Sequence, residues 1–419
     1  SMNSVQRVAA PAGALIVLWA AALSQAADPA EAAQVTACPR CAWKPPAAGK
    51  IVTLPRGGDL ANAVQSLQSG TTLLLEDGEY FLRRMADVKE PGVVIRSKSG
   101  DPSKVTVRSE GMTERKVGVV LSISAPEVTV ADLTLGYVGY HAVQVRGEKG
   151  ASKFVLHNCR LIDTGQQLLK GSFSETGHFA DDCTVACSRF EYSATAPGDY
   201  TNGVDVIAAR GWTVRDCYFR NIRGPERIGY RAGPAILFWG NSMDTRVERN
   251  VVVDCFRGIA LGLGPGVFTT PRDGDKSVDH KGGVIRNNVV ANLNSWANEG
   301  IEANAAPGVR IEHNTVFVEG SLPWAISTRF PITTGTVQNN LSNHAATSRD
   351  GSKAVKTDNV TLAKAPWFVG AASGDFHLTP EAALAIGACS TIPEASKDFD
   401  GVVRPAGQMC DAGAFQLKK

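Results

Sequence analysis

Residues 247–252 read VERNVV, residues 285–290 read IRNNVV and residues 311–316 read IEHNTV. All three follow one pattern: hydrophobic, any, polar, asparagine, any, hydrophobic. The pattern begins again at residues 337–340, and it recurs with Cys or Ser in place of Asn in residues 156–161, 185–190 and 214–219. The steps from Asn250 to Asn288, Asn314 and Asn340 are 38, 26 and 26 residues, and such periods are typical of a solenoid.

The repeated segments are rich in β-branched residues and alternate in polarity without a helical period, which indicates strands. Stacked asparagines can hydrogen-bond from one turn to the next. An inward asparagine at each turn would also satisfy the backbone groups of the corner.

A second strand series alternates with the first along the chain, once per turn, and a third, weaker series is also present. The segments of the second series are AVQVR (142–146), LLK (168–170), GVDVI (203–207), PAILFW (234–239), GIALGL (258–263), GIEAN (300–304) and WAISTR (324–329). Helical segments and hairpin turns are missing, which argues against an α/β fold or a sandwich. We therefore predict an all-β chain, a single-stranded right-handed parallel β-helix.

The chain divides into four parts. Residues 1–26 read as a tag residue and a signal peptide, because Arg7 precedes an apolar stretch (14–23) and a small-x-small cleavage site (24–26). The mature protein should begin at Ala27 and be periplasmic or extracellular. Residues 27–49 form an irregular Pro/Ala-rich lead-in with a CxxC motif, residues 50–364 the β-helix with a helical cap at 59–69, and residues 365–419 a C-terminal module.

Charge and hydropathy limit the partners. The net charge is +2 at pH 7 and no basic block stands out, so nucleic acid is not an expected partner. No stretch after the leader is apolar and long enough to span a bilayer. We expect a soluble monomer.

The nine cysteines suggest different roles. In an exported chain, Cys38 and Cys41 favour a local disulfide over a redox centre or zinc. The repeat-strand cysteines are expected to be small core residues: Cys159, Cys187 and Cys217. Cys389 and Cys410 flank a late loop and are predicted to form a disulfide.

Two terminal motifs carry a resemblance to known proteins. Residues 70–80 (GTTLLLEDGEY) resemble the first coil of carbohydrate-acting β-helix proteins, including the polysaccharide lyase group with alginate and chondroitin lyases. The end of the chain, with residues 374–378 (GDFHL) and 411–415 (DAGAF), resembles the tail of many secreted bacterial β-helix proteins. The resemblance implies the fold and a glycan partner. The lyase group's catalytic signatures and the epimerase DPHD motif are absent.

Aligning the second series by its inward hydrophobic residues places one outward residue per turn in a column. The column reads Gln144, Lys170, Asp205, Ile236, Ala260, Glu302 and Ser327. Neighbouring turns lie ~4.8 Å apart, so Lys170 and Asp205 should be adjacent. Long inserts adjoin these strands at residues 171–181, 193–202, 221–233 and 264–282, and insertions on one face of a solenoid usually build a binding wall.

This mixture of residues suits an anionic, uronate-containing polysaccharide. In β-elimination the charge of the uronate carboxylate is neutralised, and a base then removes the proton from C5. A Lys or Arg can be that base, and a Ca²⁺ ion held by protein carboxylates can neutralise the uronate. The candidate catalytic residues are Lys170 as base, Asp205, His178, and Arg231 or Arg257 as carboxylate clamps. The candidate metal ligands are Asp181, Asp182 and Asp205. The candidate substrate-binding residues are Tyr200, Tyr230, Trp239, Trp296 and Glu302.

Three alternatives stay open. Lys170 and Asp205 could form a solvated cross-strand ion pair without function. A glycoside hydrolase would need two carboxyls ~5–9.5 Å apart, and Asp205 with Asp181 or Asp182 fits that better than Asp205 with Glu302, which are ~14 Å apart by this register. A non-catalytic polysaccharide-binding or surface solenoid is the third.

Overall fold

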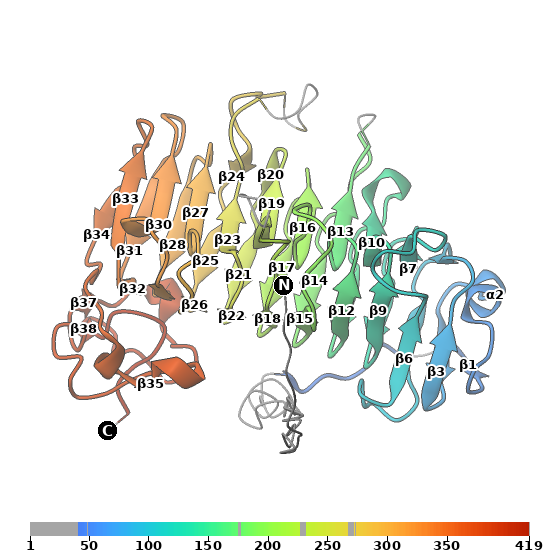
Figure 1. The fold of residues 1–419 in the computed structure, drawn as a ribbon. Coiled ribbons are helices and arrows are strands. Elements are labelled where there is room, and N and C mark those ends of the chain that lie inside the picture. The colour runs from blue at the N-terminus through green and yellow to red at the C-terminus, as the bar shows by residue number, and fades with distance from the viewer. Residues whose placement is uncertain are drawn as a thin grey trace, which may run out of the picture.

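The chain folds as a parallel β-helix, in which three long parallel sheets run along the axis (Figure 1). The computed structural model describes residues 41–47, 49–174, 177–226, 232–266, 272 and 274–418. The expected signal peptide, Cys38, Tyr230 and Arg231 lie outside the described residues. Within the described part, no helix is long and apolar enough to cross a membrane.

Each turn of the helix contributes one strand to each sheet, and neighbouring strands pair in parallel. Sheet A contains, in order, β1 (Lys50–Leu54), β2 (Thr71–Leu75), β5 (Val94–Ser97), β8 (Thr129–Ala131), β11 (Val155–His157), β14 (Thr184–Ala186), β17 (Thr213–Arg215), β21 (Arg246–Glu248), β25 (Val284–Arg286), β28 (Val309–Glu312), β31 (Gly335–Gln338) and β34 (Val355–Thr357). Sheet B contains β3 (Gly78–Phe81), β6 (Val105–Arg108), β9 (Thr134–Val138), β12 (Arg160–Thr164), β15 (Arg189–Glu191), β18 (Tyr218–Arg220), β22 (Val251–Val253), β26 (Val289–Asn292), β29 (Thr315–Val318) and β32 (Leu341–Ser342). Sheet C contains β4 (Ala86–Val88), β7 (Val119–Ile123), β10 (His141–Arg146), β13 (Leu169–Ser172), β16 (Val204–Ile207), β19 (Pro234–Trp239), β23 (Arg257–Leu261), β27 (Ile301–Asn304), β30 (Trp324–Arg329) and β33 (Ala345–Arg349).

The asparagine pattern forms the corner between sheets A and B, as predicted. Nδ2 of Asn250 donates to Oδ1 of Asn288, Asn288 donates to Asn314, and Asn314 donates to Asn340, each at 3.0 Å. The ladder ends one turn later at Asn359, which the sequence pattern did not include. The residue before each ladder position has a left-handed φ of about 50–60°, which makes the corner sharp.

Hydrophobic residues fill the inside of the coil, and their register corrects one prediction. Val143, Leu169 and Val204 are aligned and fully buried, and Ile236 continues that inward row. Ile236 was predicted to face outward, but Leu237 pairs with Asp205 instead. The prediction misplaced the outward residue by one position because every residue of this segment is apolar, so alternation gives no signal there.

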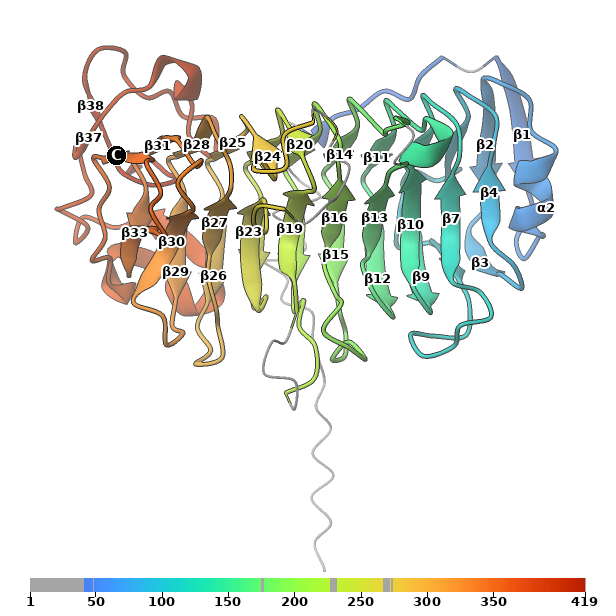
Figure 2. The same ribbon diagram turned by 90° about the horizontal axis from the view of Figure 1, so that it is seen from above.

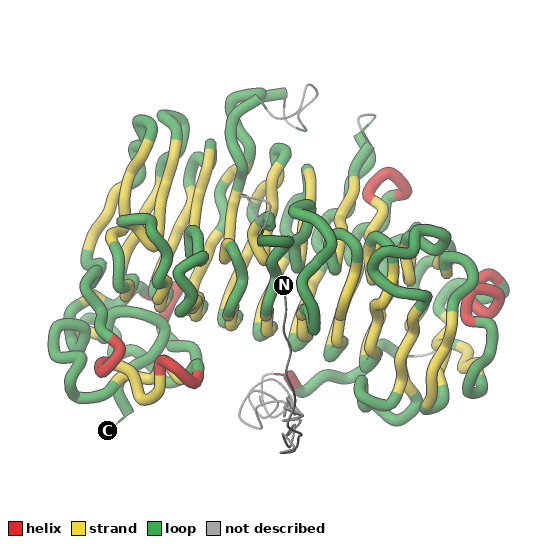
Figure 3. Tube along the Cα trace, in the orientation of Figure 1, coloured by secondary structure: helices red, strands yellow, loops and turns green. Residues whose placement is uncertain are grey.

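Helix occurs at few places in the described part, mainly the start of the coil and short turns near the C-terminus (Figure 3). Helix α2 (Leu60–Gln65) lies within the predicted cap, and Oδ1 of Asp59 accepts a hydrogen bond from the backbone N–H of Asn62 at 2.9 Å, which caps its first turn. Leu60, Ala61 and Val64 bury the inner face of the helix in the hydrophobic core.

The parallel ladder ends with β34, and the chain then packs back on the outside of sheet B. Two antiparallel pairs, β35 (Phe368–Gly370) with β36 (Asp375–Leu378) and β37 (Cys389–Ser390) with β38 (Met409–Cys410), stand in this region. It shares a second hydrophobic cluster with the outer residues of sheet B, including Val289 and Phe317.

The predicted disulfide between Cys389 and Cys410 is not present. The two residues are directly opposite each other on β37 and β38, but both are free thiols. Cys389 Sγ instead donates to the backbone oxygen of Asp358 at 3.2 Å.

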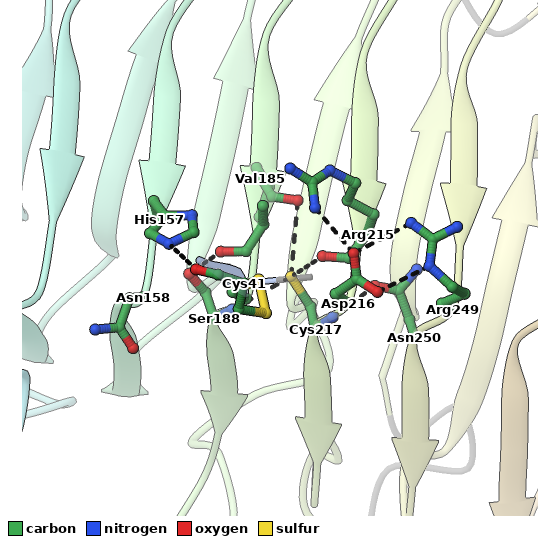
Figure 4. Close-up of a disulfide and its surroundings, with 12 residues drawn as sticks. Cys41, His157, Asn158, Val185, Ser188, Arg215, Asp216, Cys217, Arg249 and Asn250 are labelled. Carbon is green, nitrogen blue, oxygen red and sulfur yellow. Dashed lines mark hydrogen bonds and ion pairs between the residues drawn. A yellow bond between two sulfur atoms is a disulfide. The ribbon is translucent and has the colours of Figure 1, made fainter. Parts of the chain in front are cut away.

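The disulfide that the structure contains joins Cys41 to Cys187, 146 residues apart in the chain (Figure 4). The prediction of a local bond between Cys38 and Cys41 is therefore wrong. Cys187 is buried, as predicted, but it is bonded to Cys41 rather than packed in the hydrophobic cluster inside the coil. Cys187 occupies the left-handed position of the corner (φ 53°), where the N-terminal segment crosses the coil. His157 Nε2 donates to the Cys41 oxygen at 3.2 Å, and Trp43 stacks on His157. Cys159 and Cys217 are core residues, as predicted.

Candidate functional site

The outer face of sheet C carries a buried ion pair. Lys170 on β13 is aligned with Asp205 on β16, as the register predicted, and Lys170 Nζ donates to Asp205 Oδ2 at 2.7 Å. The side chains are only 9% and 1% exposed. The alternative of a solvated surface pair is therefore wrong, because neighbouring side chains cover both charges. A buried pair of this kind repays its desolvation cost only with good geometry and further hydrogen bonds.

Two aromatic side chains complete the surroundings of this pair. Trp239 Nε1 donates to Asp205 Oδ1 at 2.7 Å, so both carboxylate oxygens have partners. Tyr200 Oη lies 3.4 Å from Lys170 Nζ, and its side chain is 52% exposed. The lysine ammonium lies 5.7 Å from the Tyr200 ring centre and 5.9 Å from that of Trp239. Tyr200 therefore lies between the buried pair and solvent.

Sequence reasoning did not single out two neighbours on the N-terminal side of Lys170. His141 on β10 binds the backbone oxygen of Gln167 through Nδ1, and burial lowers its pKa to about 4, which the nearby charge of Lys170 reinforces. The Gln167 side chain is fully buried, and its Oε1 atom accepts no hydrogen bond. Such an unpaired buried acceptor is unusual in a folded protein.

The four inserts adjoin the ends of the sheet C strands, as predicted. Residues 193–202 and 221–233 lead from sheet B into β16 and β19, whereas residues 171–181 and 264–282 lead out of β13 and β23 towards sheet A. Figure 2 shows the strands of sheet C side by side along the molecule. The inserts flank the strands that carry Lys170 and Asp205 on both sides.

Arg257 and Glu302 are paired with each other rather than free for a substrate. They lie on the adjacent strands β23 and β27, both are at least nine-tenths buried, and their side chains form an ion pair. The second carboxylate oxygen of Glu302 accepts from Asn304 Nδ2 at 3.0 Å. Arg257 as a substrate clamp was predicted without knowledge of this partner, which lies 45 residues away.

The three predicted metal ligands do not come together. Both oxygens of Asp181 bind the guanidinium of Arg272, at 2.6 and 2.5 Å, and Asp205 is held by Lys170 and Trp239. Asp182 is exposed and occupies a left-handed turn. Among the described residues, no three His, Cys, Asp or Glu side chains are grouped as metal ligands. The predicted Ca²⁺ site therefore does not fit this arrangement.

The remaining predicted residues are distributed outside the Lys170 cluster. His178 is exposed in the loop after β13. Trp296 lies in the turn before β27, where the Arg223 guanidinium lies 5.1 Å from its ring centre. Asp205 and Glu302 are three strands apart in the observed register, roughly 14 Å, which is too far for a hydrolase pair.

Comparisons with known proteins agree with the fold. No family model matches the chain, and none of the curated proteins matches its sequence. Among solved structures, the pectate lyase Pel9A is 13% identical with a TM-score of 0.57, covering 89% of this chain and 97% of that chain. An alginate lyase from Paenibacillus sp. str. FPU-7 is 11% identical with a TM-score of 0.42, and the match covers 75% of this chain and 100% of that chain. PfbA, a surface adhesin of Streptococcus pneumoniae, is 11% identical with a TM-score of 0.44, and the match covers 72% of this chain and 86% of that chain. At these identities the likeness concerns the fold: the chain is a right-handed parallel β-helix that resembles polysaccharide lyases.

Proposed function

We propose that this protein is an exported enzyme that cleaves an anionic, uronate-containing polysaccharide by β-elimination on the outer face of sheet C. The observation that carries the proposal is the buried Lys170–Asp205 pair beneath the exposed Tyr200. Fold does not define function, so the argument rests on this site and not on the likeness to lyases.

In the proposed reaction, the proton shared in the Lys170–Asp205 pair first leaves for solvent, and Lys170, as the neutral amine, then takes the proton from C5 of the uronate. The electrons of the C5–H bond form the C4–C5 double bond, the bond from C4 to the glycosidic oxygen breaks, and a proton is returned to that oxygen. Asp205 and Trp239 position the lysine nitrogen through the bonds described above. A proton-transfer group within reach of the reacting carbon is the requirement for general base catalysis.

The substrate would lie along the face between the two sets of inserts. Tyr200 is exposed and adjoins the lysine, so its ring can contact a sugar. Arg231 keeps the proposed role of carboxylate clamp by its position in the insert before β19. Arg257 loses that role to its pairing with Glu302.

Export is supported by the disulfide as well as by the predicted signal peptide. The Cys41–Cys187 bond joins distant parts of the chain, and bonds of this kind persist in oxidising compartments such as the periplasm. We therefore propose that the protein works in the periplasm or outside the cell.

The test is incubation of the pure protein with a panel of acidic and neutral polysaccharides, following both ultraviolet absorbance of unsaturated products and new reducing ends. Absorbance that rises with reducing ends is the expected result for acidic glycans. Reducing ends without absorbance would identify a glycoside hydrolase instead. Retention on a glycan array without either product would identify a binding protein, and both of these results would overturn the proposal.

A further inference from the structure

A second group of charged residues lies on the same face, towards the C-terminal end of sheet C. Glu299 lies two residues before β27, which carries Glu302. Arg257 comes from the adjacent strand β23, and Arg349 from β33, two strands away on the other side. Glu302 is fully engaged, because Arg257 and Asn304 bind its two oxygens. Glu302 is four strands from Lys170 in the observed register, roughly 19 Å.

Glu299 is engaged less completely, with the Ser327 side chain as its polar neighbour. Its side chain is buried, with 5% of the residue exposed, yet Oε1 has no hydrogen-bond partner. Its other oxygen, Oε2, lies 3.7 Å from Arg349, which is longer than a hydrogen bond. A buried carboxyl oxygen without a partner is costly, and Glu312 Oε2 on sheet A is in the same state. What distinguishes Glu299 is its place on the sheet C face beside Arg349 and Trp324.

The charge state of the group follows from its surroundings. Burial and the neighbouring Glu302 raise the pKa of Glu299 to about 8, against the lowering effects of Ser327, Arg257 and Arg349. Glu299 therefore carries a proton at neutral pH and can donate a hydrogen bond. Arg257 and Arg349 supply positive charge beside this protonated carboxyl, which suits an anion.

Arg349 and Trp324 connect this group to solvent. The Arg349 guanidinium lies 4.2 Å from the ring centre of Trp324, and its side chain is 27% exposed. Trp324 Nε1, like Glu299 Oε1, is buried without a hydrogen-bond partner. The arginine can thus reach a ligand at the surface, and a shift of its side chain would open the buried carboxyl and indole N–H beside it to the same ligand.

We propose that Glu299, Arg349 and Trp324 form a second binding position for a carboxylate of the same acidic glycan, so that one polysaccharide chain spans this position and Lys170. The inference rests on the proposed function, since it takes the same substrate class on the same face. It extends that function by assigning a distal subsite, through which long chains bind more tightly than short ones.

The experiment measures affinity by calorimetry in the Lys170→Gln background, so that the ligand is not cleaved. The probes are oligogalacturonates and oligomannuronates of two lengths, a dimer and a chain long enough to span four strands. Glu299→Ala and Arg349→Ala should each weaken binding of the long oligomer by roughly tenfold to a hundredfold, as expected for a lost hydrogen bond to a charged group. Binding of the dimer should change little.

Glu299→Gln separates the hydrogen-bond role from the charge. The amide keeps a donor without a charge, so affinity at neutral pH should be retained. With Glu299 present in the Lys170→Gln background, affinity should fall as the pH rises through about 8, because Glu299 then ionises beside Glu302. The glutamine variant should not show that fall.

Glu312→Gln is the matched control. Glu312 is also a buried glutamate beside arginines with a raised pKa, but it lies on sheet A. It should leave oligomer affinity unchanged.

Equal affinity of the Lys170→Gln background and of its Glu299→Ala and Arg349→Ala variants for the long oligomer would overturn the subsite and leave the proposed function standing. Absence of binding to every acidic oligomer would overturn both. Loss of turnover in Glu299→Gln at unchanged affinity would also overturn the subsite, since Glu299 would then transfer a proton.

Discussion

The corner between sheets A and B and the outer face of sheet C both bury polar side chains, but they do so differently. At the corner, the same residue type recurs, and each asparagine amide bonds to the next turn. On sheet C, the buried polar residue changes from turn to turn, and several side-chain oxygens on or next to its strands have no partner, namely those of Gln167, Glu299, Asn304 and Ser327. A uniform, saturated ladder is what stability requires, whereas a varied and unsaturated row indicates recognition of something outside the chain.

Burial of charge alone does not make this distinction. Glu248, Arg286 and Glu312 on sheet A are also buried charged residues that pair between turns. There, however, the C-terminal region covers them, and Arg286 binds the backbone oxygen of Glu394. Their burial has a structural explanation within the chain.

The sharpest test of the comparison is replacement of Lys170 by glutamine. Glutamine keeps a donor for Asp205, whereas truncation to alanine would leave a buried charge unpaired at a cost of about 3–5 kcal/mol. On a polysaccharide that the parent degrades, turnover should fall by roughly 10²–10⁴-fold, the usual contribution of a proton-transfer group.

The control for this variant is Lys153→Gln. Lys153 pairs with Glu127 at 3.0 Å, but both side chains are more than half exposed. An exposed pair contributes about 0–1 kcal/mol, so turnover and unfolding should stay close to those of the parent. Full activity in Lys170→Gln would show that the buried pair has only a structural role.

Replacement of Asn314 by alanine tests the other side of the comparison. The change removes the acceptor for Asn288 and the donor to Asn340 and Ile285 in the middle of the ladder. Unmade buried hydrogen bonds cost ~1–3 kcal/mol each, so we expect a loss of about 3 kcal/mol in the free energy of unfolding. Denaturant titration measures it.

Turnover per folded molecule should be unaffected by Asn314→Ala. Asn314→Ser reproduces the residue found at the same corner position in Ser188, whose hydroxyl accepts from the backbone N–H of Cys159. It should therefore lose less stability than the alanine variant. Equal losses would argue against the ladder bonds as the cause.

A further prediction concerns the pH dependence of stability at Glu299. Its pKa is about 8 in the folded protein, above the ordinary 4.5, so the folded state keeps a proton that the unfolded state loses. This contribution to stability is fully present below pH 4.5 and is lost as the pH rises through 8. Glu299→Gln should therefore gain melting temperature relative to the parent as the pH increases from 5 to 9. Glu127→Gln, an exposed position, should show a constant difference, and a constant difference in Glu299→Gln as well would refute the assigned protonation.

Some features of the site were readable from the sequence. The adjacency of Lys170 and Asp205 followed from aligning inward hydrophobic residues, since in a parallel coil that alignment sets the register. Glu299 was overlooked, although Glu299-Gly300-Ile301 repeats the charged-Gly-Ile pattern of Arg257-Gly258-Ile259 one turn earlier. Its environment was beyond sequence reasoning, because Glu302, Arg257 and Arg349 meet there from three separate strands.

The sequence by itself determined the coil, its sheets and the asparagine corner, because each turn repeats a short local pattern and contacts only its neighbours. The tertiary structure alone decided which distant segments meet. Cys41 bonds Cys187 rather than a close cysteine, Asp181 is held by Arg272 rather than joining Asp205, and Lys170 is buried rather than solvated. Such contacts depend on loops and a terminal segment that fold back over the coil, and no repeat in the sequence encodes where they come to lie.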